Sequence, residues 1–251
     1  MLLTDMTWPA IRALDKNVPV VIPIAAVEQH GHHLPMATDS MLLAEIVRRA
    51  EAAVGTRALF APLQWLGNSH HHTDFPGTVS APPRLYLDLL CELAENFLRH
   101  GFKRVLFLNG HGGNSIPGKQ AVFELRQKYR HQSNLLLLSC AYWDLAVPEL
   151  LGPDFVQKQM GHACEWETSM ILRLAPQLVA QDVSTLQSIP FDYGFDPAYR
   201  GWITKDRSTT GHIGSPQFAT EEKGERLFAT FSAGAVTFIT SVAEWDGSSW
   251  I

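Results

Sequence analysis

The sequence predicts an α/β fold with three layers, α/β/α, in which a mainly parallel sheet lies between two layers of helices. Short β-branched apolar runs alternate with longer amphipathic segments along the first half of the chain. Right-handed crossovers in such a chain place the carboxyl ends of the strands at one edge of the sheet. The chain has 251 residues, 46% of them hydrophobic, which is enough for one sizeable core. We therefore expect a single domain over residues 1–251.

The first elements follow directly from this alternation. Residues 18–26 (VPVVIPIAA) form a β-branched run without helical periodicity, which indicates a buried strand. Residues 40–54 carry apolar side chains at helical spacing, and Gly55 provides a C-terminal stop. Residues 57–63 are predicted to form the second strand.

Four further elements continue the same rhythm. A helix opens at Pro82 and ends at Gly101. The run RVLFL at residues 104–108 is the third predicted strand. A helix over residues 117–130 and a fourth strand over residues 135–139 follow it.

The second half of the chain is less regular. We expect a helix over residues 161–174. Residues 184–216 are rich in glycine, proline, aspartate and serine, and we expect an extended loop region near the site or at an interface. Residues 219–242 are predicted to form one or two closing helices, because Gly224 and Gly234 weaken a single continuous helix.

Composition excludes several classes of function. A net charge of −5 and the lack of a basic run give no electrostatic reason to bind nucleic acid or an anionic membrane. The three cysteines form no C-x-x-C pair, so neither a disulfide framework nor a thiolate zinc site is indicated. With no signal-like N-terminus and no apolar stretch of the ~20 residues that a membrane helix needs, we expect a cytoplasmic protein.

The first chemical motif is EQHGHHLPMATD, at residues 28–39, directly after the first predicted strand. Parallel sheets bind ligands at this edge, and residues i and i+2 of an extended backbone point to the same side. Glu28 and His30 can therefore face one pocket, and Asp39 can return to it from the start of the next helix. Carboxylate plus imidazole is an ordinary ligand set for zinc or manganese. The alternative is a polar turn with solvated histidines.

The second motif is NGHGGN, at residues 109–114, between the third predicted strand and a helix. It places His111 at the same edge of the sheet, and the flanking glycines let the backbone turn tightly near a ligand. A phosphate-binding loop is the competing interpretation. Neither G-x-G-x-x-G nor a P-loop lysine pattern is present, which favours a metal-binding histidine.

The third motif is GHACEWETS, at residues 161–169. His162 and Glu165 are three positions apart and could face the site from one helical surface. Glu167 would point elsewhere in a continuous helix, so a ligand role for Glu167 requires an irregular helix start. Spacing alone does not separate Glu165 from Glu167, and an acidic helix N-terminus without a ligand role remains open.

The fourth motif is GNSHHHTDFPGT, at residues 67–78. Three consecutive histidines are not in themselves a metal motif, because neighbours in an extended chain point opposite ways. We expect one of them to line the pocket and assign that role to His70. Residues 75–78 (FPGT) predict a rigid turn.

Taken together, these segments resemble the creatininase (creatinine amidohydrolase) family. The matching pieces are E-x-H-G-x-H-L-P with Asp39, G-x-S-x-x-H before F-P-G-T, N-G-H-G-G-N, H-A-x-x-x-E-T-S and, from Thr210 to Gly224, T-G-x-x-G-S-P-x-x-A-T-x-E-K-G. They span nearly the whole chain, in the family's order. The resemblance implies an α/β/α fold, a binuclear metal centre, a homo-oligomer (commonly a hexamer) and hydrolysis of an amide carbon–nitrogen bond.

The resemblance also implies the metal ligands. One ion would be bound by Glu28, Asp39 and His111, and the other by His30, the bridging Asp39 and a second carboxylate. Creatininases proper supply that carboxylate two positions after the third-strand histidine, where this chain has Gly113, so Glu167 is the natural substitute. We expect two divalent ions per chain, zinc foremost, with manganese or iron as alternatives.

The resemblance finally bears on mechanism and substrate. His162 matches the family's H-A position and is our candidate for general acid and base, because imidazole titrates near neutral pH. Gly112 and Gly113 are, with His70, the expected substrate contacts. Gly112 replaces the aromatic residue of creatininases proper, so we expect a small-molecule amide other than creatinine. A formamide hydrolase or a peptidase of cofactor or redox-peptide biosynthesis, and a non-catalytic metal-binding scaffold, are the alternatives.

Overall fold

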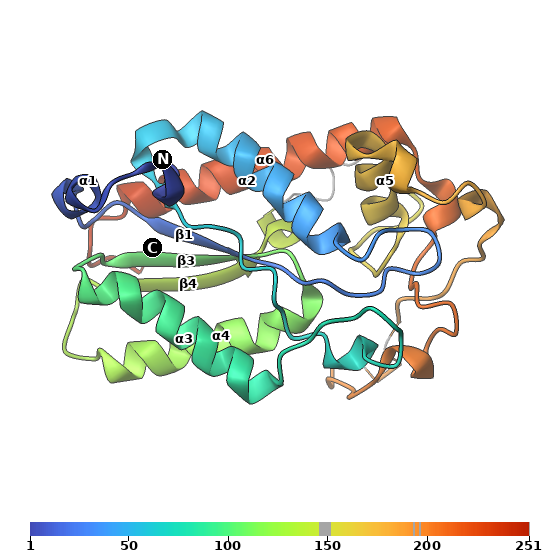
Figure 1. The fold of residues 1–251 in the computed structure, drawn as a ribbon, viewed down its shortest axis with the longest axis horizontal. Coiled ribbons are helices and arrows are strands. Elements are labelled where there is room, and N and C mark those ends of the chain that lie inside the picture. Colours follow the sequence, from blue (N-terminus) through green and yellow to red (C-terminus); the bar gives the residue numbers. More distant parts are fainter. Residues whose placement is uncertain (146–151, 193, 196, 251) are drawn as a thin grey trace.

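The computed structural model describes residues 1–145, 152–192, 194–195 and 197–250. Within this part of the chain, one sheet lies between two layers of helices (Figure 1). Its strands are parallel and run in the order β2-β1-β3-β4. They are β1 (Val20–Ile24), β2 (Leu59–Phe60), β3 (Arg104–Asn109) and β4 (Leu136–Ala141). The prediction of an α/β/α fold with a parallel sheet is confirmed.

The two helical layers bury both faces of the sheet. One layer consists of α2 (Thr38–Val54), α5 (Glu165–Leu174) and α6 (Glu221–Glu244), and the other of α3 (Pro83–Arg99) and α4 (Ser115–Lys128). A short helix, α1 (Trp8–Ala13), was not predicted. Alternate side chains of β1 enter different cores, Val21 on the side of α2 and Ile22 on the side of α3. A strand buried on both faces needs a continuous apolar run, which is what β1 has.

The edge strand β2 is much shorter than the predicted strand over residues 57–63. Residues Gly55–Arg57 form a 3₁₀ turn, so the strand cannot begin there. On the other side, Ala61 still donates to the Val21 carbonyl at 2.9 Å, but the next hydrogen bond to β1 comes from Gln64, which donates to the Pro23 carbonyl, so one extra residue interrupts the regular ladder.

The helix predicted over residues 161–174 begins four residues late, at Glu165. Ala163 has a φ of +48°, outside the helical region. His162 is in extended backbone and pairs with Ile213 through hydrogen bonds of 2.9 and 2.7 Å. The expectation that His162 and Glu165 share a helical face is therefore wrong.

Helix α6 is one continuous helix, and its glycines serve close packing. A Cβ atom at Gly224 would lie 2.0 Å from the Ser169 carbonyl oxygen of α5, and one at Gly234 would lie 2.4 Å from the Leu145 carbonyl oxygen. By length and hydropathy alone α6 could cross a membrane. Its apolar side chains, including Phe228 and Phe231, are buried in the core that α2 and α5 also form.

The region over residues 184–216 is extended where the structure describes it, as predicted, with only short 3₁₀ turns at Val183–Thr185, Thr204–Asp206 and Pro216–Phe218. It lies beyond the carboxyl ends of the strands, together with the turn η3 (His70–His72) and the start of α2 (Figure 1). Loops distant in the sequence thus gather at one end of the sheet, where parallel sheets bind their ligands.

Candidate metal centre

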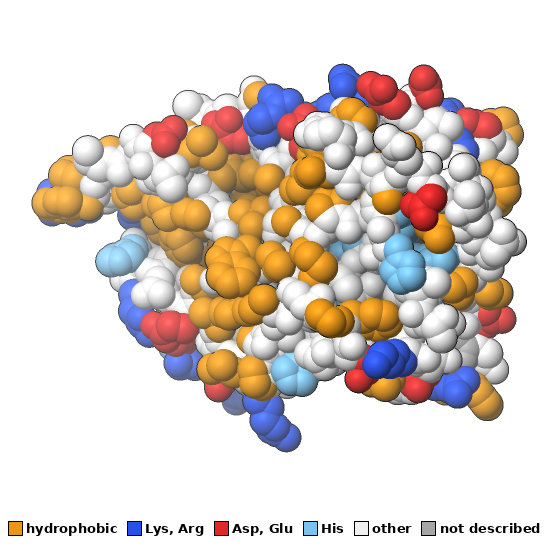
Figure 2. Space-filling view, turned by 45° about the vertical axis from the view of Figure 1, so that its right-hand side comes forward, with side chains coloured by type: hydrophobic (Ala, Val, Ile, Leu, Met, Phe, Trp, Pro, Cys, Tyr) orange, Lys and Arg blue, Asp and Glu red, His pale blue; other side chains and the backbone are white. Residues whose placement is uncertain are grey.

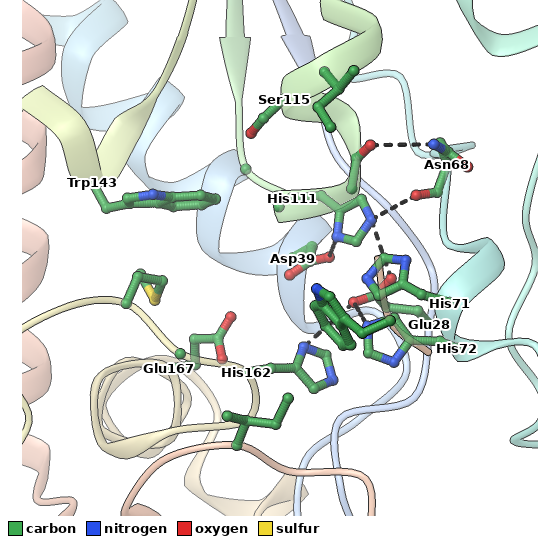
Figure 3. Close-up of a pocket in the computed structure, with 18 of the residues that line it drawn as sticks. Glu28, Asp39, Asn68, His71, His72, His111, Ser115, Trp143, His162 and Glu167 are labelled. Carbon is green, nitrogen blue, oxygen red and sulfur yellow. Dashed lines mark hydrogen bonds and ion pairs between the residues drawn. The ribbon is translucent and has the colours of Figure 1, made fainter. Parts of the chain in front are cut away.

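The side chains predicted to bind metal lie together beyond the carboxyl ends of β1 and β3 (Figure 3). Asp39 lies at the centre, with Oδ1 3.1 Å from His30 Nε2 and Oδ2 3.0 Å from His111 Nδ1. Glu28 Oε2 is 3.3 Å from His111 Nε2. Glu167 Oε1 is 3.7 Å from His30 Nε2. One carboxylate therefore stands between two imidazoles, each of which has a second carboxylate beside it.

Local hydrogen bonds set the position of His111 at the end of β3. The Asn109 side chain accepts from the His111 backbone N–H at 3.0 Å and donates to the His111 carbonyl at 2.7 Å. These two hydrogen bonds hold the backbone of His111 in a fixed conformation. Asp39 enters from the first turn of α2, and its side chain is buried against the same imidazole.

The structure separates the two glutamates that spacing left open. Glu165 Oε1 forms an ion pair of 2.6 Å with Lys223 Nζ, and Glu165 Oε2 accepts from the Gln157 N–H at 2.7 Å. Glu167 lines the cavity instead, and its Oε2 accepts from the Cys164 N–H at the start of α5. Because the helix begins at Glu165, Glu167 occupies its first turn and its carboxylate reaches His30. This is the irregular start that a ligand role for Glu167 requires.

Backbone carbonyls fix which nitrogen of each histidine carries the proton. A carbonyl oxygen can only accept, so His30 Nδ1 donates to Glu28 O at 3.2 Å and His162 Nε2 donates to Gln29 O at 2.8 Å. His111 Nε2 donates to the Asn68 carbonyl at 3.0 Å. When these imidazoles are neutral, the opposite nitrogens carry a lone pair that faces a carboxylate, which is the arrangement of metal-binding histidines.

Burial and charge shift the pKa values of these groups strongly. Burial raises the pKa of Glu28 to about 7. Burial alone would lower the pKa of His111, but the carboxylates of Glu28 and Asp39 outweigh it and raise this pKa to about 9. For His30, burial likewise opposes the charged form, and Asp39 still raises the pKa well above its usual value. In the absence of cations, protons on the imidazoles balance the buried carboxylates.

The donor set fits divalent cations. Both oxygens of Glu28 and Oδ2 of Asp39 are fully buried and accept no hydrogen bond of good geometry in the described part of the chain. Leaving buried charged oxygens in this state costs several kcal/mol, which a bound cation removes. Three groups of side chains bring their ligand atoms within 4.8 Å of one another: Glu28, Asp39 and His111; His30, His162 and Glu167; and Glu28, His72 and His162. Mixed carboxylate and imidazole groups suit zinc or manganese.

Gly112 and Gly113 line the same cavity of about 540 Å³ as Glu28, Asp39 and His111. A Cβ atom at Gly113 would lie 2.1 Å from the Asn68 carbonyl oxygen and 2.5 Å from His111 Nε2. No side chain fits there, so this backbone cannot carry a ligating glutamate at position 113.

The expectation that His70 lines the pocket is wrong. His70 is exposed, and its Nδ1 lies 2.7 Å from Ser80 Oγ. Residues His70–His72 form a 3₁₀ turn, not an extended segment, so His71 and His72 can both face the cavity while His70 faces outward. His72 Nε2 is 3.2 Å from Glu28 Oε1. Position 72 is also where the G-x-S-x-x-H pattern ends, which was the signal for it.

Sequence reasoning did not find two further parts of the site. Gln29 links two histidines from separate segments, because its side-chain Nε2 lies 2.7 Å from His72 Nδ1 and its backbone carbonyl accepts from His162 Nε2 at 2.8 Å. The lining of the cavity also includes Trp202 and Arg207. Those two residues belong to the irregular region over 184–216, where no periodicity indicates which side chains face inward.

Comparison with known proteins gives a consistent result. A family model described as "Creatininase: Creatinine amidohydrolase" matches residues 4–239. A mycofactocin precursor peptide peptidase of Mycolicibacterium smegmatis is 32% identical over 228 residues, which cover 89% of this chain and 85% of that protein. A creatinine amidohydrolase of Pseudomonas putida is 27% identical over 243 residues, covering 89% and 90%.

Solved structures agree with the sequence relatives. A structure described as "Creatininase Mn" has a TM-score of 0.79 at 25% identity, covering 96% of this chain and 97% of that one. A creatininase variant described as Zn-Zn type has the same identity, TM-score and coverage. The likeness therefore spans every element that carries the candidate metal centre.

Proposed function

This chain belongs to the creatininase family of metal-dependent amidohydrolases, and from that premise we propose that it hydrolyses a non-protein or cyclic amide bond of a small molecule with water activated by two divalent metal ions. The observation that carries the proposal is the position of Asp39 between His30 and His111 at 3.1 and 3.0 Å. A carboxylate placed in this way can bridge two ions.

The ligands would divide into two sets that share Asp39. Glu28 and His111 would complete the first set, and His30 and Glu167 the second. Gly113 supports the choice of Glu167, because the backbone around it excludes any side chain from the position that ligates in creatininases proper. Zinc is the ion we propose, with manganese or iron as alternatives.

Divalent ions held there would supply Lewis acidity, polarising the amide carbonyl and lowering the pKa of a water molecule to about 7. Hydrolysis adds water across the C–N bond, so the leaving nitrogen must gain a proton. We assign this transfer to His162, whose Nε2–H is held by the Gln29 carbonyl at 2.8 Å while Nδ1 lies 3.5 Å from Glu28 Oε1. Burial and the charge of His30 hold the pKa of His162 well below its usual value, so Nδ1 rests without a proton and, once it has taken one, gives it up readily to the leaving nitrogen.

A peptide-like substrate is the second candidate. The cavity of about 540 Å³ lies in the range that encloses drug-sized ligands, whereas creatinine is a single small ring. Trp143 and Trp202 line it, and aromatic walls suit a substrate with apolar side groups. The relative of 32% identity is a peptidase for a precursor peptide, which supports the same candidate.

Chelation and reloading test the proposed function. Protein purified without chelator should contain about two transition-metal ions per chain and should hydrolyse at least one member of a panel of cyclic amides, formamides and short peptides. Chelator should abolish that hydrolysis, and zinc, manganese or iron(II) should restore it. A folded protein without metal, or hydrolysis indifferent to chelator, would contradict the proposal. Bound metal without any hydrolysis would favour the non-catalytic scaffold.

His162→Ala separates catalysis from metal binding. We expect turnover to fall by about 10²–10⁴-fold with metal content unchanged, the range for a lost general acid–base group. The matched control is His70→Ala, because His70 is exposed and bonded to Ser80 outside the cavity. Loss of metal in the His162 variant would instead make His162 a ligand.

Assembly and location are proposed from family membership. Figure 2 shows a broad area of hydrophobic side chains across one face of the molecule. Exposed large hydrophobic residues of the described chain include Trp65, Leu85 and Ile116, which are 50%, 58% and 61% exposed. Such surface supports a homo-oligomer, and we propose a hexamer in the cytoplasm. Light scattering of the purified protein tests the hexamer, because a monomer mass would exclude it.

A further inference from the structure

We infer that Arg207 forms an anion subsite of the candidate active site and that the substrate is an amide carrying a carboxylate at the end remote from the scissile bond. The inference rests on the proposed function, because it takes the ions at Glu28, Asp39 and His111 as the place where the bond is cleaved. Arg207 lines the same cavity as these residues. Among the described residues that line it, Arg207 is the only lysine or arginine.

The guanidinium group of Arg207 is held in a fixed orientation. Its Nη2 donates to the carbonyl oxygens of Pro190 and Asp192 at 3.0 and 3.2 Å. Its Cζ lies 5.2 Å from the ring centroid of Trp202 and 5.7 Å from that of Phe191. A planar guanidinium that is stacked and hydrogen-bonded loses little conformational freedom when it binds an anion. This preorganisation is what a recognition residue needs.

Aromatic rings connect Arg207 with the candidate metal ligands. The Trp202 ring contacts His71 edge to face, with centroids 5.1 Å apart. His71 in turn stacks on His111, with centroids 5.8 Å apart. The rings of Trp202 and His71 therefore lie between the guanidinium group and the imidazole of the proposed ligand His111. A small substrate can span this interval, with its amide at the ions and its other end at Arg207.

The charge balance of the loaded site favours an anionic substrate. Glu28, Asp39 and Glu167 bring three negative charges, and two divalent ions outweigh them by one charge. The loaded centre therefore no longer repels an anion, and Arg207 adds a positive charge to the lining of the same cavity. Guanidinium forks match the geometry of a carboxylate, and such charge-assisted hydrogen bonds are about twice as strong as neutral ones. The substrate class is therefore an acidic amide, such as an acyl amino acid or a peptide with a free C-terminus.

The test uses metal-chelating probes so that no substrate has to be known. Hydroxamates with a carboxylate tail, spaced by two to five methylene groups, are compared with the same compounds carrying a carboxamide tail. Binding to the zinc-loaded protein is measured by calorimetry, for the wild type, Arg207→Met, Arg207→Lys and the surface control Arg48→Met. The hydroxamate group of both probes chelates the metal ions in the same way in each protein variant. The ratio of the two dissociation constants therefore reports only on the tail.

For at least one spacer, we expect the wild type and Arg48→Met to bind the carboxylate probe about tenfold or more tighter than the carboxamide probe. The ratio should fall to about one in Arg207→Met and to an intermediate value in Arg207→Lys. Equal binding of both tails to the wild type at every spacer overturns the subsite and leaves the two-ion proposal intact. Hydroxamate binding that survives removal of zinc, or no binding by either series, overturns the two-ion proposal and the subsite with it.

Discussion

Position 113 is where the backbone packs most tightly around the candidate metal centre. The Asn68 carbonyl oxygen and His111 Nε2 both lie within 2.5 Å of the place where a Cβ atom would stand at Gly113. A Cβ atom at the neighbouring Gly112 would have no atom within 4 Å. Of these two adjacent glycines, only Gly113 is therefore required by the space around it.

This difference gives a matched pair of variants. Gly113→Ala should lower the free energy of unfolding by about 1–3 kcal/mol, because the loop or His111 must shift to admit a methyl group. Gly112→Ala should change it by less than about 0.5 kcal/mol. Urea denaturation of the metal-free proteins measures both, and metal content reports whether His111 has moved. Equal stability of the two variants would contradict the close packing at Gly113.

Metal binding should release protons. In the metal-free protein the pKa of His111 is raised to about 9 and that of His30 is raised well above its usual value, so both hold protons at pH 7. Each must lose its proton to become a ligand, and Glu28, whose pKa is raised to about 7, is about half protonated at that pH, so binding of two ions at pH 7 should release about two to three protons. A histidine pKa that is higher in the folded than in the unfolded chain stabilises the metal-free fold. This stabilisation is complete at pH values below the pKa of the unfolded chain, and it is lost as the pH rises through about 9. Metal affinity should therefore increase with pH up to about 9.

Calorimetric titration with zinc in buffers of different ionisation enthalpy counts these protons. A binding enthalpy that does not depend on the buffer would show that no proton leaves and would contradict the charged state of the two histidines. The shifted pKa values themselves could not be predicted from the sequence. They arise from burial and from the distances of both imidazoles to Asp39, which only the fold determines.

Residues next to strand ends were the ones that sequence could place. Glu28, His30 and His111 follow directly from β1 and β3, so the known edge of a parallel sheet brings them together. His70 was the wrong choice among three histidines because a 3₁₀ turn replaced the extended backbone that the reasoning assumed. No local sequence pattern predicted that Arg207 lines the cavity, because its position depends on an irregular loop that returns to the end of the sheet.

A buried ion pair with α6 holds helix α5 and positions its first turn. Glu165 is fully buried and pairs with Lys223 of α6, which also donates to the Phe218 carbonyl at 2.7 Å. Glu167, two residues on, points to the opposite side and into the cavity. The pair therefore fixes the rotation of the helix that carries a proposed ligand.

Lys223→Met tests this arrangement. It leaves the Glu165 carboxylate buried without its cation, so we expect a loss of about 3–5 kcal/mol in unfolding free energy together with weaker metal binding. Lys205→Met is the control, because Lys205 is exposed and its Nζ is 3.8 Å from Asp74, and it should cost less than about 1 kcal/mol. An unchanged unfolding midpoint for Lys223→Met would show that the pair does not hold α5.

Among the elements, the predictions were most accurate for the central strands, for α4 and for α2 and α3, whose apolar side chains recur at helical spacing. Boundaries failed where a local conformation overrode the pattern, as at Ala163 before α5 and after Ala61, where the pairing with β1 skips to Gln64. Gly224 and Gly234 suggested a break in α6. The break is absent because tertiary contacts with Ser169 and Leu145 use the missing side chains.

The candidate centre joins segments that are far apart in the chain. Residues after β1, at the start of α2, after β3 and at the start of α5 all supply a side chain to it. Ions bound to all four segments would stabilise the native state and not the unfolded chain. Each ion present at about 1,000 times its dissociation constant would add about 4 kcal/mol.

Chelation should therefore lower the melting temperature by about 10 °C or more, given about 2–4 °C per kcal/mol for a chain of this size. Differential scanning calorimetry before chelation, after chelation and after zinc is returned measures the shift and its reversal. Asp39→Asn should melt near the temperature of the chelated wild type and gain little from added zinc. A melting temperature that is indifferent to chelator would exclude ions that tie the four segments together.

The spread of these side chains from Glu28 to Glu167 has a consequence for synthesis in the cell. A nascent polypeptide leaving the ribosome presents His30, Asp39 and His111 long before Glu167 emerges. The strand–helix units that contain His30, Asp39 and His111 therefore assemble before the ligand set of the second ion is complete. Binding of the second ion, whose proposed ligands include Glu167, then belongs to a later stage of maturation than binding of the first, and a cell starved of zinc would accumulate folded but unloaded chains.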